Sequence, residues 1–167
     1  MKSTKLLLAL PAIMFAIPAL ATGNHAGGHE AEGAIGQPGI ASEVTRTLKV
    51  DMSDTMRFSF SNIAVKQGET VRFIVKNSGK VKHEMVLGTE KELKEHAELM
   101  KKNPEMEHAD DNMVTVAPGN TGEIIWQFTK AGKVDFACLQ PGHYEAGMKG
   151  VVRVAGAKKD GHADHKH

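Results

Sequence analysis

Residues 138–148 have the sequence CLQPGHYEAGM, which places a thiol, an imidazole and a thioether in one short segment near the C-terminus. Four residues separate Cys138 from His143, and four more separate His143 from Met148. Two histidines, one cysteine and a distant axial methionine form the ligand set that holds copper for one-electron chemistry. The segment therefore supplies three of the four side chains that such a copper site requires.

The fourth ligand has to come from elsewhere in the chain, and His83 is the best candidate. It lies in the segment NSGKVKHEM, residues 77–85, where a Ser-Gly turn precedes a short apolar run. Turn residues followed by β-branched and apolar residues predict that a short strand begins near His83. Zinc also accepts histidine and cysteine, but structural zinc sites are built from these two residue types without methionine, so the sequence favours copper.

With this upstream histidine and a C-terminal loop that carries the other three ligands, residues 43–155 resemble the cupredoxins, the family of plastocyanin, azurin and rusticyanin. The ligand spacing is similar to that of rusticyanin, and the chain is most similar to periplasmic copper-tolerance cupredoxins. The resemblance implies an all-β Greek-key sandwich with one type 1 copper that cycles between Cu(I) and Cu(II). It further implies that His143 passes electrons at the surface and that the copper ligands are His83, Cys138, His143 and Met148.

Glu84 departs from the pattern of many electron-transfer cupredoxins, in which an asparagine follows the first histidine. In those proteins the asparagine amide ties the histidine strand to the cysteine loop. An ionised carboxylate accepts hydrogen bonds but cannot donate them. The sequence therefore leaves open whether this tie is made here, and with it the redox potential and the rigidity of the site.

Residues 1–21 are expected to be a signal peptide for export to the periplasm. Lys2 and Lys5 precede an apolar stretch, and small residues stand at positions 19–21, where a signal peptidase would cleave. The stretch contains two prolines, so we favour cleavage over a retained membrane anchor. The mature chain would have 19 basic and 20 acidic residues, a formal charge of −1, which does not indicate a nucleic-acid partner.

Cys138 is the only cysteine of the chain, so it cannot form an internal disulfide. In an oxidising compartment an unpaired thiol is a liability unless something occupies it, and metal ligation would do so. The alternative is a buried structural thiol, because a free cysteine packs like a small hydrophobic residue. The positions of His143 and Met148 favour metal ligation.

Short β-type runs alternate with glycine-containing turns from residue 43 onward, which predicts one β-sandwich domain of about eight strands. A helix is expected over residues 89–103, because Thr89 and Glu92 form a capping box and Pro104 follows its end. The expected strands are residues 44–52, 56–65, 70–77, 83–87, 113–116, 122–128, 133–138 and 150–154.

Residues 22–42 and 156–167 are rich in glycine, alanine, histidine and charge, and are expected to be disordered. Further histidines and methionines suggest additional copper capture, and His96 and Met100 share one face of the predicted helix. Core packing explains Met100 equally well, because it continues the apolar stripe of Leu93 and Ala97, so further copper sites remain open. The accessory residues are His25, His29, His96, Met100, Met106, His108, Met113, His162, His165 and His167.

These features bear on three classes of function. The accessory residues and the resemblance favour a periplasmic protein that binds copper ions and contributes to copper tolerance, with a redox or copper-transport protein as partner. A diffusible electron carrier, which needs the type 1 site alone, is the alternative. An oxidase of organic substrates is not expected, because His165-Lys166-His167 is the only His-x-His pair, although slow oxidation of Cu(I) is left open.

Overall fold

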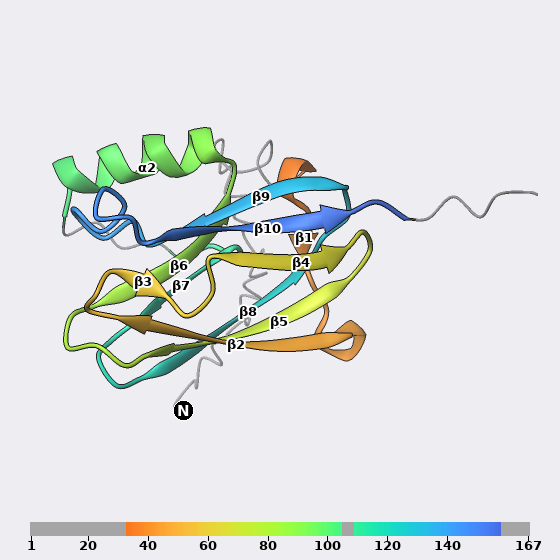
Figure 1. Ribbon diagram of the computed structural model, residues 1–167, viewed down its shortest axis with the longest axis horizontal. Helices are drawn as coiled ribbons and strands as arrows, with labels where there is room; N and C mark the ends of the chain where they lie inside the picture. The colour runs from red at the N-terminus through yellow and green to blue at the C-terminus, as the bar shows by residue number, and fades with distance from the viewer. Residues whose placement is uncertain (1–32, 105–108, 158–167) are drawn as a thin grey trace, which may run out of the picture.

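The structure, a computed structural model, describes residues 33–104 and 109–157. Within these ranges the chain forms ten strands in two five-stranded sheets, together with helix α2 (Glu90–Lys102) and a short 3₁₀ helix, η1 (Ala41–Glu43). Figure 1 shows the two sheets as layers, with α2 lying over the layer that contains β9 and β10. This is the expected all-β sandwich with one helical insertion, while the expected signal peptide lies outside the described residues.

The first sheet has the strand order β1–β8–β5–β2–β3. Its centre is β5, which pairs in parallel with β2 and antiparallel with β8. Val71, Phe73 and Val75 of β5 are fully buried, as expected from the alternation of apolar residues along this strand. The strands are β1 (Gln37–Pro38), β2 (Arg46–Ser53), β3 (Arg57–Phe58), β5 (Thr70–Asn77) and β8 (Thr121–Gln127).

The second sheet has the strand order β4–β10–β9–β6–β7. It begins with a parallel pair, β4 and β10, and continues with antiparallel pairs. Strands β9 and β6 are neighbours, so the end of β9 lies beside the ligand-bearing β6. The strands are β4 (Asn62–Lys66), β6 (His83–Gly88), β7 (Met113–Val116), β9 (Gly132–Ala137) and β10 (Lys149–Ala155).

The single strand expected over residues 56–65 is wrong, because this segment forms two strands that belong to different sheets. Strand β3 pairs with β2, whereas β4 pairs with β10. Between them the Ser59 N–H donates to the Asp51 carbonyl at 2.8 Å, and Ser61 accepts from the Val151 N–H at 2.9 Å. The chain therefore passes from one sheet to the other within three residues.

The segment before residue 43 is ordered where the structure describes it, contrary to the disorder expected for residues 22–42. Strand β1 pairs with β8, and Ile35 is buried with its carbonyl accepting from Trp126 Nε1 at 3.0 Å. Gly36 makes this approach possible, since its φ is +122° and a Cβ there would lie 2.1 Å from the Gln127 carbonyl oxygen. Residues 33–42 are thus part of the sandwich, and residues 22–32 lie outside the described residues.

The main core fills the space between the two sheets. Its largest fully buried side chains include Trp126, Phe73, Phe128 and Phe136. Burial of this apolar surface is the dominant force that holds the two sheets together. Met85, two residues after His83, is also fully buried in this core.

A second core cluster lies between α2 and the outer face of the second sheet. The predicted capping box is present, with Thr89 and Glu92 bonded to each other, and the predicted stripe of Leu93, Ala97 and Met100 is buried. The same cluster contains Leu139 and Tyr144 from the segment that carries three predicted copper ligands.

Among the described residues, no helix is both long and apolar enough to cross a membrane.

Candidate metal centre

The four predicted ligands lie at the junctions between strands and loops. His83 is the first residue of β6, as expected from the sequence. The other three lie in the segment 138–148, here called the ligand loop, which begins directly after β9 and ends directly before β10. In Figure 1 this loop lies at one end of the sandwich, beside the C-terminal half of α2.

Three donor atoms converge at this end of the sandwich. Cys138 Sγ lies 3.2 Å from His143 Nδ1 and 3.9 Å from His83 Nδ1. A metal about 2.0 Å from nitrogen and about 2.3 Å from sulfur, with trigonal angles, needs a nitrogen–sulfur separation of about 3.7 Å. The observed separations lie about 0.5 Å below and 0.2 Å above this value, so the three donors have nearly the spacing that a copper ion needs.

The ligand loop is folded back so that its candidate ligands are tied to one another. The Cys138 N–H donates to the Met148 carbonyl, and the Met148 N–H donates to the His143 carbonyl, both at 3.0 Å. Met148 and Cys138 are fully buried, whereas His143 is half-buried. The thioether therefore lies in the interior, and the imidazole of His143 reaches toward the surface.

The ring of His83 is oriented by Asp54, a residue that the sequence analysis did not identify. Its Nε2 lies 3.2 Å from Asp54 Oδ1, and the ring itself is fully buried. A carboxylate at this distance accepts a hydrogen bond, so we assign the proton to Nε2, which then donates to Asp54 and leaves the lone pair of Nδ1 facing Cys138. This is the tautomer that metal binding through Nδ1 requires.

The loop before His83 is held from both sides. Asn77, buried at the end of β5, donates from Nδ2 to the carbonyls of Val81 and Val116. Asp54 accepts from the Lys80 N–H at 2.7 Å, which is the main reason that its pKa lies below the ordinary value. The close approach of Asp54 requires a glycine at position 79, where a Cβ would lie 2.0 Å from Asp54 Oδ1.

Burial shifts the pKa values of Cys138 and His143, the two donors that lie closest to each other. It raises the pKa of Cys138 to about 12, against smaller lowering effects of the Glu84 and Gln140 amides. Burial also lowers the pKa of His143, which favours the neutral imidazole that binds metal. Near neutral pH the metal-free site therefore holds a thiol beside neutral His143, and copper binding requires loss of the thiol proton.

The tie between the histidine strand and the cysteine loop, left open by the sequence, is present. Glu84 makes it as an acceptor, taking a hydrogen bond from the Leu139 N–H at 3.0 Å. The Glu84 N–H in turn lies 3.4 Å from Cys138 Sγ and donates to it. Residue 84 thus connects β6 to the ligand loop through both its backbone and its side chain.

Among the described residues, the accessory histidine His96 belongs to no second group of histidine, cysteine and acidic side chains. There, the group of histidine, cysteine and acidic side chains with metal-binding spacing consists of His83, Cys138 and His143. Met100 and Met113 are buried in the second core cluster, which favours packing as their role. The remaining accessory residues, apart from half-buried His96, lie outside the described residues: His25, His29, Met106, His108, His162, His165 and His167.

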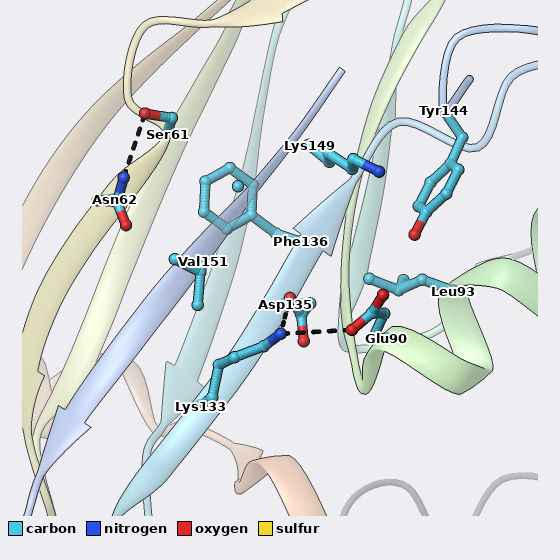
Figure 2. A pocket seen from close by; sticks show the side chains of 11 residues that line it. Ser61, Asn62, Glu90, Leu93, Lys133, Asp135, Phe136, Tyr144, Lys149 and Val151 are labelled. Carbon is cyan, nitrogen blue, oxygen red and sulfur yellow. Dashed lines mark hydrogen bonds and ion pairs between the residues drawn. The ribbon is translucent and has the colours of Figure 1, made fainter. Parts of the chain in front are cut away.

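A separate pocket of about 300 Å³ lies on the outer face of the second sheet, next to the ligand loop. Figure 2 shows Lys133 bridging Asp135 and Glu90 at one side, with Tyr144 at the other. Lys149 lies over the Tyr144 ring, 4.5 Å from its centroid. The pocket therefore adjoins the metal centre through Tyr144 but contains none of its donors.

Comparison with known proteins places the same residues in a copper-binding family. Residues 44–155 match the family described as copper binding proteins, plastocyanin/azurin family. The chain is 55% identical over 132 residues to the copper-resistant cuproprotein CopI of Rubrivivax gelatinosus, covering 78% of this chain and 80% of that protein. It is 37% identical over 153 residues to the protein of the same name from Pseudomonas aeruginosa, covering 72% and 82%.

Solved structures show the same fold. Auracyanin from Roseiflexus castenholzii superposes with a TM-score of 0.57 at 23% identity, covering 67% of this chain and 98% of that one. Auracyanin A from Chloroflexus aurantiacus gives a TM-score of 0.55 at 24% identity, covering 65% and 97%. The family match, the sandwich and the converging donors agree on one type 1 copper as the cofactor. The chain belongs to the plastocyanin/azurin family of copper-binding proteins, the cupredoxins.

Proposed function

We propose that this protein is an exported copper-binding protein that contributes to copper tolerance. Its type 1 site holds one copper through His83, Cys138, His143 and Met148, and this ion cycles between Cu(I) and Cu(II). The observation that carries this proposal is the convergence of Cys138 Sγ with the Nδ1 atoms of His83 and His143 at the end of the sandwich. The relatives named copper-resistant cuproprotein support the role in tolerance.

The donor set suits a metal that changes oxidation state. Thiolate and thioether ligands favour Cu(I), whereas imidazole binds both states, so a bound copper can exchange one electron here. The chain supplies a fixed frame for this exchange, because the backbone bonds within the ligand loop and the Asp54 contact to His83 hold the donors in place. Burial of Cys138 also protects its sulfur from bulk oxidants.

The ligand assignment is tested by replacing Cys138 with serine. We expect the copper-loaded protein to have an intense visible band from sulfur-to-copper charge transfer, and the Cys138→Ser variant to lack it. Met148→Leu is the companion variant, and it should shift the reduction potential more than it weakens copper binding. An intense band retained in Cys138→Ser would show that the assignment is wrong.

The role in tolerance is tested in the host cell. Deletion of the gene should lower the copper concentration at which cells grow, and the wild-type gene should restore growth. The Cys138→Ser gene should fail to restore it, although the protein is made in equal amount. Restoration by this variant would separate tolerance from the type 1 site.

A diffusible electron carrier is the second candidate, favoured by the half-buried position of His143 at the surface end of the site. A copper titration with visible and electron paramagnetic resonance spectra distinguishes the two. Saturation at one type 1 copper favours the carrier. Additional equivalents with weakly coloured signals, lost when the accessory histidines and methionines are replaced, favour copper capture.

Export is proposed from the lysines, apolar stretch and small residues of positions 1–21. N-terminal sequencing of the protein recovered from the periplasm should begin at residue 22. A chain that retains residues 1–21 and stays with the membrane would contradict this part of the proposal.

A further inference from the structure

Glu84 is a buried carboxylate that lies beside the metal centre and binds the ligand loop. It is 3% exposed, and it follows His83 on β6. Its Oε1 accepts from the Leu139 N–H, while its Oε2 accepts from Gln140 Nε2, both at 3.0 Å. Oε2 also accepts from Thr115 Oγ1 on β7 at 3.3 Å. One side chain therefore joins a ligand strand, its neighbour and the ligand loop.

The position of these contacts bears directly on the copper ligands. Leu139 follows Cys138, so a bond to its N–H fixes the peptide that carries the cysteine. The backbone N–H of Glu84 donates to Cys138 Sγ at 3.4 Å, which restrains the sulfur itself. Both bonds are made between protein groups alone, so neither requires a bound metal to form.

The charge of Glu84 is not cancelled by these donors. An amide, a carboxamide and a hydroxyl are neutral groups, and all three donate, which is the pattern that an ionised carboxylate requires. A negative charge in a buried position interacts strongly with nearby charges, because little water screens it. It stabilises doubly charged copper more than singly charged copper at the adjoining site.

We propose that Glu84 positions the ligand loop on β6 and that its buried charge lowers the reduction potential of the site, which favours Cu(II) over Cu(I). The proposal rests on the copper ligands assigned above and extends that assignment to a residue that does not touch the metal.

The charge is tested with Glu84→Gln, which keeps an oxygen for the Leu139 N–H and removes the negative charge. We expect the ratio of Cu(I) to Cu(II) binding constants to rise at least tenfold, equivalent to about 59 mV for one electron. The visible band should persist, because the four ligands remain. Glu95→Gln, an exposed position on α2, is the matched control and should leave the potential unchanged. A Glu84→Gln potential equal to that of the control would overturn this half of the proposal.

The positioning role is tested without copper, by hydrogen exchange of the Leu139 amide. Glu84→Ala should speed its exchange at least tenfold, whereas Glu84→Gln should leave it protected. If Glu84→Ala does not fold, the double variant Thr115→Val and Gln140→Ala removes two of the three donors and should speed exchange in the same direction. Unchanged exchange in the folded variant would overturn the positioning role. Absence of the visible band in the wild-type protein would instead contradict the copper site, and the exchange result would still stand.

Discussion

At the scale of single residues, Asp54 is the partner through which the copper site depends on a distant turn. Asp54→Asn weakens the acceptor for His83 Nε2 while leaving an oxygen for the Lys80 N–H. Loss of such a partner to a metal-binding histidine typically lowers metal affinity by roughly 10- to 100-fold. We expect copper affinity to fall within this range, measured by competition with a chelator of known affinity.

Asp51→Asn is the matched control for Asp54→Asn. Asp51 bonds Ser78 in the same loop but makes no contact with the His83 ring among its described hydrogen bonds. It should reduce copper affinity much less than the Asp54 change. Equal losses in the two variants would mean that the loop as a whole, and not the bond to His83, sets the affinity.

The candidate ligands could be predicted from sequence because three of them lie within eleven residues and share one loop. Their companions could not be predicted, since each contact joins residues far apart in the chain. Asp54 lies 29 residues before His83, and the Leu139 amide lies 55 residues after Glu84. No local pattern carries these pairings, because they arise from the order in which the strands pair.

At the scale of elements, α2 supports the ligand loop through the second core cluster. Met100 is 3% exposed, and it shares this cluster with Leu139 and Tyr144. Met100→Ala leaves a cavity there and should lower the free energy of unfolding by about 2–5 kcal/mol. Denaturant unfolding of the metal-free protein, followed by circular dichroism, measures this change.

Leu99 provides the control for Met100, because it stands next to it on α2 but is 44% exposed. Leu99→Ala should change the free energy of unfolding by less than about 0.5 kcal/mol. If both variants lost the same stability, the helix would contribute through its propensity and not through the cluster. The helix itself was predictable, since its capping box and apolar stripe are local signals.

Strand boundaries were predictable only where each strand stays in one sheet. The expected strand over residues 56–65 failed because apolar residues continue through the crossing, although Ser59 and Ser61 bond to different sheets. The alternation of apolar and polar residues along a strand indicates which side chains face the core, but both sheets face the same core. The pattern therefore cannot distinguish one long strand from two short ones on opposite layers.

At the scale of the whole molecule, two parallel strand pairs bring together segments that lie far apart in the sequence. Strand β2 lies beside β5, and β4 lies beside β10. The β2–β5 pair places the turn that carries Asp54 next to the loop that precedes His83. The composition of residues 33–42 gave no sign of order, because it is the fit of Ile35 and Gly36 against β8 that orders them.

The short strand β1 also determines which strand edge the first sheet exposes to other molecules. Without it, β8 would be the outer strand of its sheet, with unpaired amides and carbonyls that invite pairing with a second chain. Pro38 lacks an N–H, so the added strand is itself a poor template for further growth. A chain that begins at residue 40 should form oligomers in light scattering, whereas a chain that begins at residue 33 should stay monomeric. We therefore expect the seven residues 33–39, which contain no candidate copper ligand, to protect a concentrated protein against aggregation.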